Sequence, residues 1–272
     1  MNDELAEARF ASQTLPLDYF TPSNMKHKLC ILILSILALP ALAQDLEGVV
    51  SYTKISNYAK ISSRMDYLSQ EEKDRIKLTW GNENENKTKM TLFFTPTQSK
   101  YTYDENQDDE DRRYSWRKQE YLIFRDFEQE TKTEIIEMLG KTYVIEDSLK
   151  APKWKVMNKI KDVAGHVCML AVTEDTIKRQ KIEAWFAHDL PVPAGPGQYF
   201  GLPGLIMELD VNEGDVVITA QKIEMKPVGE AVQLPKKIKG KKLTNKAYDA
   251  LIYTHIRDSM TAQRNPFWSM PY

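Results

Sequence analysis

An apolar turn that leads directly into an apolar strand constrains this chain more than any other feature. Residues 199–210 read Tyr-Phe-Gly-Leu-Pro-Gly-Leu-Ile-Met-Glu-Leu-Asp. Pro203 presets φ and Gly204 accommodates a positive φ, so residues 202–205 are expected to form a type II turn. The apolar run 205–211 predicts a buried strand. Because connections normally cross the surface and are polar, we expect the fold to cover this turn.

The rest of the chain predicts a mainly β fold. Short segments of alternating apolar and polar residues are separated by turn signals at intervals of about 8–12 residues. This spacing favours a curved antiparallel sheet or a partly open β-barrel over βαβ units. The expected strands cover residues 46–55, 88–94, 99–103, 121–126, 132–138, 141–146, 153–158, 166–173, 181–187, 205–211 and 215–225.

Two helices and one long connection complete the predicted fold. A capping box at residues 69–72 predicts a short helix near the N-terminal end, over about residues 69–78. Thr244 is a suitable N-cap for a C-terminal helix over 245–260, which we expect to pack on the sheet before a short aromatic tail. Residues 187–204 form a long connection that its prolines and aromatic residues predict to be ordered.

The first 43 residues have the features of a leader. Residues 25–43 combine a basic start, an apolar stretch and a small-residue cleavage signal, which is typical of a secretory signal peptide. We interpret residues 1–24 as a misassigned upstream extension and residues 44–272 as a single β-rich domain. Cys30 precedes the apolar stretch, so a lipid anchor at the cleavage site is not expected. The sequence thus predicts an exported protein, periplasmic or secreted, with no transmembrane span after cleavage.

Charge and motifs exclude several classes of function. The formal net charge is only −2, which gives no support for binding to nucleic acid or to an anionic membrane. The chain contains no nucleophile elbow, zinc-protease motif, Walker A loop or dinucleotide fingerprint. We therefore expect no cofactor and no catalytic residues of these types.

The region around the apolar turn resembles the GLPGLI family, which is found mostly in secreted proteins of Bacteroidetes and has no known function. The resemblance implies an exported β-rich protein and no particular activity. Similar segments precede the motif at residues 153–155, 165–168 and 171–173. The motif itself is Gly201, Leu202, Pro203, Gly204, Leu205 and Ile206, and the residues associated with it are Trp185, Gly195, Pro196 and Glu208.

Two patterns suggest metal binding, and both have a simpler interpretation. His166 and Cys168 share a strand face and could form half of a metal site, but neither His188 nor His255 has a suitable spacing to complete it. A buried thiol beside an edge histidine is the favoured interpretation. Residues 104–109 begin like a calcium loop but lack the required glycine and final glutamate, which favours a solvated acidic loop.

Carboxylates near the motif allow an enzymatic alternative. A pair drawn from Glu183, Asp189, Glu208 and Asp210 could serve glycoside hydrolysis, although their spacing does not select this over a surface role. Residues 147–149, 175–177 and 258–260 match the short Asp-Ser/Thr-hydrophobic pattern at which exported Bacteroidetes proteins are O-glycosylated.

Three functions remain open. The first is a non-enzymatic binding or carrier module of the periplasm or cell envelope, with a deep apolar pocket near the motif. The second is a structural or interaction protein of the envelope, with an exposed apolar patch around residues 267–268 or the proline-rich connection. The third is a hydrolase that uses the carboxylates. The partner is unknown, and an apolar ligand or an envelope protein are the candidates.

Overall fold

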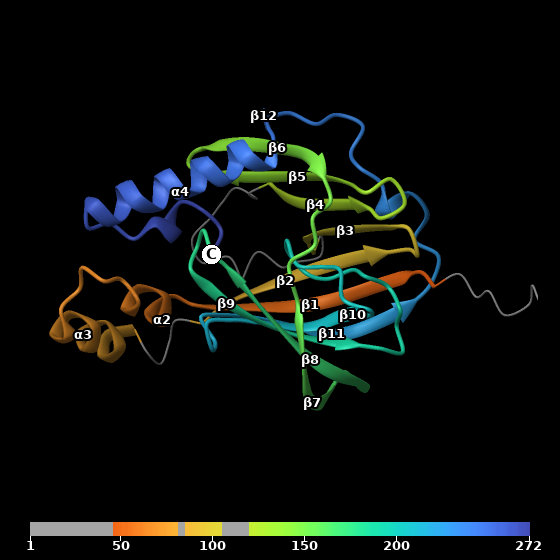
Figure 1. Ribbon diagram of the computed structural model, residues 1–272, viewed down its shortest axis with the longest axis horizontal. Helices are drawn as coiled ribbons and strands as arrows, with labels where there is room; N and C mark the ends of the chain where they lie inside the picture. Colours follow the sequence, from red (N-terminus) through yellow and green to blue (C-terminus); the bar gives the residue numbers. More distant parts are fainter. Residues whose placement is uncertain (1–45, 81–84, 105–119) are drawn as a thin grey trace, which may run out of the picture. The chain divides into compact units, whose positions relative to one another are not determined.

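A single twelve-stranded sheet carries the part of the chain that the structure describes (Figure 1). The structure is a computed structural model that describes residues 46–80, 85–104 and 120–272. The strands are β1 (Gly48–Asn57), β2 (Glu85–Phe94), β3 (Gln98–Tyr103), β4 (Tyr121–Asp126), β5 (Thr131–Met138), β6 (Lys141–Ser148), β7 (Lys155–Val163), β8 (His166–Asp175), β9 (Gln180–Ala187), β10 (Leu205–Val211), β11 (Val216–Met225) and β12 (Lys241–Leu243).

The sheet is open and almost wholly antiparallel. Its order is β12-β6-β5-β4-β3-β2-β1-β11-β10-β9-β8-β7, so β12 and β7 are its two edges. The predicted mainly β architecture is confirmed, but the sheet does not close into a barrel. β12 pairs with β6 in parallel, which corrects the prediction of a purely antiparallel sheet. This pairing arises because the chain crosses from β11 to the far edge before it forms β12.

The sequence misplaced one strand and missed another, each for a physical reason. The strand expected at residues 153–158 lies at Lys155–Val163, where most side chains are exposed, so the sequence has no alternation that would mark its ends. Trp154 lies just before this strand and is used elsewhere, as its indole N–H donates to the Phe200 carbonyl at 2.8 Å. β12 spans only three residues, which is too short for a periodic signal.

The helices lie at the two ends of the described chain. Two helices, α2 (Tyr58–Ser63) and α3 (Gln70–Trp80), separate β1 from β2, where we expected one. The capping box forms at the start of α3, because the Ser69 N–H donates to Glu72 Oε2 and the Glu72 N–H donates to Ser69 Oγ. The remaining helices are α4 (Asn245–Thr261) and two short 3₁₀ segments, η3 (Gly229–Val232) and η4 (Pro266–Trp268).

The C-terminal helix packs on one edge of the sheet. Thr244 caps α4 by accepting a hydrogen bond from the Ala247 N–H at 3.3 Å, as predicted. α4 contacts β6 and β12 and buries Tyr248 and Ile252 in a small apolar cluster. In the described ranges, no helix has both the length and the apolar character that a bilayer crossing requires.

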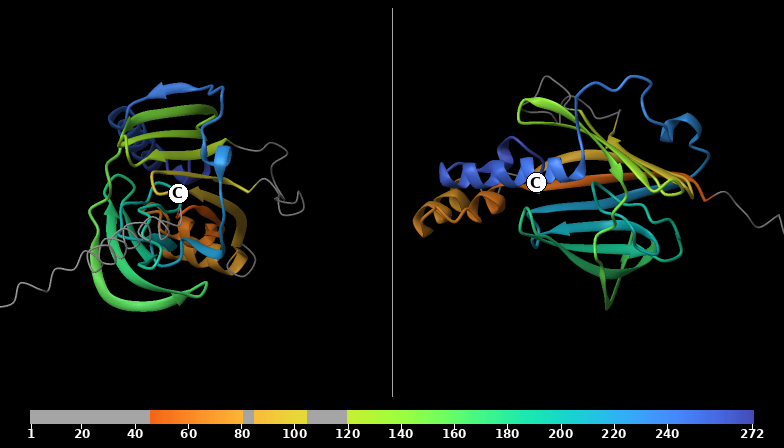
Figure 2. Two further views of the ribbon diagram at one scale, coloured as in Figure 1. Left: turned by 90° about the vertical axis from the view of Figure 1, so that its right-hand side faces the viewer. Right: turned by 45° about the horizontal axis from the view of Figure 1, so that its top comes forward.

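The sheet bends over its own concave face and encloses the main core. Figure 2 shows the strands coloured yellow to lime and those coloured teal to light blue as two layers of this one sheet. The connection between β9 and β10 runs inside the bend, and Leu190, Val192, Ala194 and Leu202 from it join the core. Leu202, Leu205 and Ile206 are buried as well, so the expectation that the fold covers the apolar turn is confirmed.

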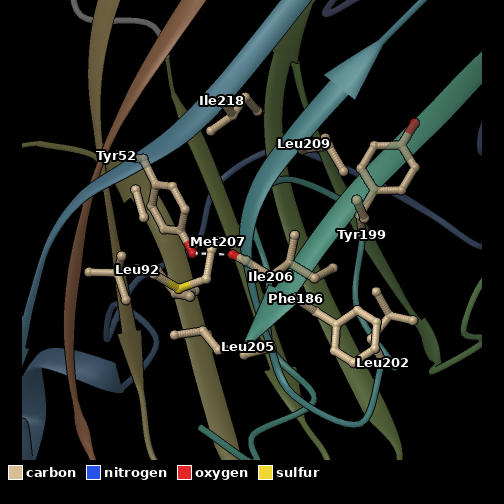
Figure 3. Packing of buried hydrophobic residues seen from close by; sticks show 14 of the residues in the cluster. Tyr52, Leu92, Phe186, Tyr199, Leu202, Leu205, Ile206, Met207, Leu209 and Ile218 are labelled. Atoms are coloured by element: carbon tan, nitrogen blue, oxygen red, sulfur yellow. Dashed lines mark hydrogen bonds between the residues drawn. The ribbon is translucent and has the colours of Figure 1, made fainter. Parts of the chain in front are cut away.

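Carbonyl groups of this buried connection and of the start of β10 accept hydrogen bonds from side chains that are distant in the sequence. The Tyr52 hydroxyl donates to the Ile206 carbonyl at 2.6 Å (Figure 3), beside a bulge that interrupts the pairing of β10 with β9. The Arg125 guanidinium donates to the Gly197 carbonyl at 2.5 Å, and Trp154 binds the Phe200 carbonyl as described above. Buried carbonyl groups without a partner would cost free energy, so these donors allow an irregular segment to lie in the core.

The motif glycines act differently from the sequence prediction. Gly201 has a φ of +87°, whereas Gly204 is not among the residues with positive φ, so the predicted type II geometry at Gly204 is wrong. Gly204 is instead required by close packing, since a Cβ there would lie 2.1 Å from the Ala187 carbonyl oxygen. Leu202, Leu205 and Ile206 are buried, with 0–2% of their surface exposed.

Replacement of Gly204 by alanine is expected to lower the free energy of unfolding by about 3 kcal/mol or more, because the new methyl group collides with backbone. Gly165→Ala is the control, since Gly165 has a positive φ but open space around it, and it should cost only about 1–2 kcal/mol. Urea denaturation measures both variants. Equal losses in the two variants would contradict the packing argument.

Removal of the Tyr52 hydroxyl in Tyr52→Phe should destabilise the protein by about 1–3 kcal/mol, because the Ile206 carbonyl then stays buried without its partner. Tyr101→Phe is the matched control, since the buried Tyr101 hydroxyl has no hydrogen-bond partner among the described residues. Thermal and urea denaturation should show Tyr101→Phe as stable as the wild type or more so. A neutral Tyr52→Phe variant would rule out this role of the hydroxyl.

Candidate functional site

Two of the motif-associated residues face each other across neighbouring strands. Trp185 is opposite Glu208 in the pairing of β9 with β10. Lys161 of β7 lies over the Trp185 ring at 4.5 Å and forms an ion pair with Glu208 at 2.5 Å. Trp185 and Glu208 therefore hold Lys161, and with it the edge strand β7.

The other two motif-associated residues belong to the buried connection. A Cβ at Gly195 would lie 2.7 Å from both the Tyr199 carbonyl oxygen and the Ile206 side chain. Pro196 is buried, and its carbonyl accepts a hydrogen bond from the Tyr199 N–H at 3.3 Å. Both residues thus pack the connection against the motif strand.

The candidate metal ligands do not converge. His166 pairs with Asp189 at 2.7 Å, and Cys168 is fully buried, which raises the pKa of its thiol to about 11. His188 is exposed and His255 contacts the Pro266 carbonyl at 3.0 Å. Within the described ranges, no three His, Cys, Asp or Glu side chains are placed to hold a metal ion.

The structure describes the calcium-like loop only in part, and it buries one of the three glycosylation patterns. The calcium-like loop 104–109 lies outside the described residues except for Asp104, which accepts a hydrogen bond from Thr91 Oγ1 at 3.0 Å. Of the glycosylation patterns, Ser148 and Thr176 are exposed, but Ser259 is 5% exposed on α4. A folded chain cannot present Ser259 to a glycosylating enzyme.

The carboxylates proposed for hydrolysis lie away from the core-facing side of the sheet. Glu183 is opposite Asp210 across β9 and β10, and partial burial raises the pKa of Asp210. Asp189 is engaged with His166, and Glu208 with Lys161. None of the four lines either cavity described below.

A cleft of about 450 Å³ lies between the concave face of the sheet and the C-terminal tail. Its walls come from β1, α2, β2, β3, β4, β5, β11 and the segment that begins with η4. Met90, Tyr101 and Ile218 are buried wall residues, while Tyr58 and Trp268 are exposed. Residues 201–206 line neither this cleft nor the smaller cavity. The neighbouring residues Tyr199 and Leu209 line only the smaller cavity, of about 40 Å³, so the deep apolar pocket that we predicted near the motif is not found in either of these two cavities.

Lys54 of β1 is the central charged group of this cleft. Its half-buried side chain lines both the cleft and a smaller cavity of about 40 Å³. Burial, and then the charge of Lys178, lower the pKa of Lys54 to about 8. Lys178 donates to the Pro271 carbonyl at 3.1 Å, whereas Lys54 forms no ion pair with any residue that the structure describes.

Tyrosine rings form one wall of the cleft. Tyr101 contacts Tyr52 and Tyr121 edge-on, at centroid distances of 6.1 and 6.2 Å. Burial raises the pKa of Tyr101 well above its ordinary value, so its hydroxyl stays a hydrogen-bond donor. The sequence predicted the strand 99–103 that carries Tyr101 but gave no sign that Lys54 would line the same cleft.

These features define an open, bent, mainly β domain with a sealed core at the motif and a cleft beside it. The chain belongs to a family described as a protein of unknown function (Porph_ging), which matches residues 50–208. A search of curated proteins finds no match.

Three solved structures align with this chain at low sequence identity. The structure described as PNGF-II in the P21 space group is 13% identical with a TM-score of 0.51, over 76% of this chain and 33% of that chain. The structure of PNGF-II in the C2 space group is 12% identical with a TM-score of 0.49, over 76% of this chain and 32% of that chain. The structure of an uncharacterized conserved protein from Thermus thermophilus is 4% identical with a TM-score of 0.36, over 78% of this chain and 99% of that chain. This chain therefore spans about a third of the PNGF-II chain, and the likeness concerns the fold alone.

Replacement of Lys54 by methionine should stabilise the protein at pH 7, by about 2 kcal/mol, because a half-buried charge is removed. The folded pKa of about 8 lies below the ordinary value of 10.5, so the unfolded chain binds more protons between these values. The stability of the wild type should therefore rise with pH across this window. The advantage of Lys54→Met should shrink accordingly by pH 10.

Urea denaturation of both proteins at pH 7 and pH 10 measures this difference. Lys87→Met is the control, because Lys87 is an exposed lysine on the neighbouring strand, and its effect should be small at both pH values. A Lys54→Met variant that is less stable than the wild type at pH 7 would show that the lysine is not a cost to the fold.

Proposed function

We propose that the chain is an exported, non-enzymatic binding or carrier module, and that its small-molecule ligand occupies the cleft beneath the C-terminal tail. The observation that carries this proposal is the cleft itself, with Lys54 and the tyrosine wall facing it. Its volume of about 450 Å³ falls in the usual range of ligand sites, about 300–1,000 Å³. Aromatic and apolar side chains line it together with charged and hydroxyl groups, and the polar groups contribute the larger share of its exposed surface.

Export is supported by the leader-like features of residues 25–43, which favour a location in the periplasm or outside the cell. We also propose that the family matched at residues 50–208 is the GLPGLI family, because the matched region contains the motif at residues 201–206. In this proposal the motif is a folding device that seals the core, and the binding site lies elsewhere.

Lys54 also supports a binding role through its effect on stability. A half-buried lysine with a lowered pKa costs free energy at neutral pH. Residues whose pKa is perturbed inside a cleft are candidates for functional sites. A side chain that binds a ligand can lower the stability of the free protein, and Lys54 combines such a cost with a position in the wall of the cleft.

The alternative of an envelope interaction protein is supported by Trp268, because 77% of the surface of this side chain is exposed. The proline-rich connection does not add to such a patch, because most of its apolar side chains are buried. The hydrolase alternative has less support, since its carboxylates are outside the cleft.

Thr88→Trp should block ligand binding, because Thr88 lines the cleft and an indole would fill much of it. The probe is the neutral apolar dye Nile red, whose fluorescence rises on binding. We expect the apparent affinity to fall by about tenfold or more. The control Lys87→Trp places the same side chain at the exposed neighbouring position and should leave dye binding unchanged. Equal dye binding by both variants would exclude the cleft as the site.

A further inference from the structure

We propose that the ligand of this cleft is an amphiphilic carboxylate, whose carboxylate group binds Lys54 and Tyr101 and whose apolar chain lies along the rest of the cleft. This inference rests on the proposed binding function and adds the chemical class of the ligand.

The first argument is a surplus of hydrogen-bond donors. The Lys54 ammonium group carries three donors and forms no ion pair with any described residue. The Tyr101 side chain is 1% exposed, and its hydroxyl has no partner in the described parts of the chain. Buried donors are nearly always paired in folded proteins. The Tyr101 hydroxyl is such a buried donor without an acceptor among the described residues, and the half-buried Lys54 ammonium group lines the same cleft; together they favour a bound molecule that supplies acceptor oxygens.

The second argument is the sign of the charge. Lys178 lines the adjoining small cavity together with Lys54 and lies close enough to lower the pKa of Lys54, so a second cation lies next to the Lys54 end of the cleft. Glu134 lines the adjoining small cavity, but it already forms an ion pair with Lys132 at 2.8 Å. An anion would relieve this positive charge, and a charge-assisted hydrogen bond to it is stronger than one to a neutral oxygen.

The remaining carboxylates of the cleft determine the orientation of the ligand. Glu120 and Glu137 also line it, and Glu137 accepts a hydrogen bond from the Glu120 N–H at 3.3 Å. Glu137 lies on β5, four strands from Lys54 in the order of the sheet. An anionic group is thus favoured at β1 and disfavoured at β5.

The apolar part of the ligand has its own surface. Met90 and Ile218 are buried beside the Lys54 end, and Met138 and Phe267 line the cleft further along. Methionine side chains adapt to flexible apolar partners. These side chains offer an alkyl chain apolar contacts within a lining that is otherwise polar.

Isothermal titration calorimetry at pH 7 tests the inference with three probes. Decanoate has the charge and the chain, decan-1-ol has the chain alone, and acetate has the charge alone. The wild type should bind decanoate at least tenfold more tightly than decan-1-ol, and acetate should show no measurable binding.

Variants assign the contacts. Lys54→Met should weaken decanoate about tenfold or more and leave decan-1-ol unchanged or slightly tighter, and Tyr101→Phe should weaken decanoate severalfold. Neither variant is expected to lose stability, so a failure to fold would not imitate these losses. The control Lys87→Met removes an exposed lysine and should bind decanoate like the wild type.

Two outcomes would overturn the inference in distinguishable ways. If decan-1-ol binds as tightly as decanoate and Thr88→Trp abolishes both, the cleft binds apolar molecules but not carboxylates, and only the present inference fails. If neither decanoate nor decan-1-ol binds, and Nile red does not bind either, the proposed function fails with it. Unchanged decanoate binding by Lys54→Met would likewise exclude Lys54 as the anchor.

Discussion

The fold depends on hydrogen bonds that let an irregular backbone lie inside a bent sheet. Connections usually stay at the surface because their polar groups need water. Here Tyr52 and Trp154 donate to carbonyl groups of the connection or the motif strand. Arg125 adds a third such bond and lies over the Phe200 ring, with its Cζ 4.7 Å from the ring centroid. With these carbonyl groups satisfied, the apolar side chains of the same segment can fill the core without a penalty from the backbone.

Strand β1 joins the sealed core to the cleft. Tyr52 and Lys54 are two residues apart, so they project from the same face of the strand. Tyr52 is fixed by its bond to the motif strand, and Lys54 reaches the cleft wall. The docking of the motif therefore positions a lysine whose burial costs stability. The apolar motif in this way sets indirectly the geometry of a site that the motif does not touch.

The sequence predicted the parts of this fold that local patterns encode. Alternation marked most strands, and the cap at Thr244 marked α4. The expected role of Gly204 was wrong because a sequence shows where glycine is tolerated but not which neighbour approaches it. The strand Lys155–Val163 was misplaced because its exposed side chains carry no period. The cleft was missed because Lys54, Tyr101 and the tail residues come together only when β1, β3 and the C-terminal segment meet in space.

The bond between Tyr52 and Ile206 joins residues 154 positions apart in the chain. A core closed by such distant contacts has high contact order, and proteins of this kind fold slowly because chain entropy is lost before the contacts form. The first strand to be synthesised must wait for the motif strand before its tyrosine is buried. For a chain that we propose is exported, this delay would be useful, since it would keep the polypeptide unfolded and able to thread through a translocation channel until most of the domain has crossed.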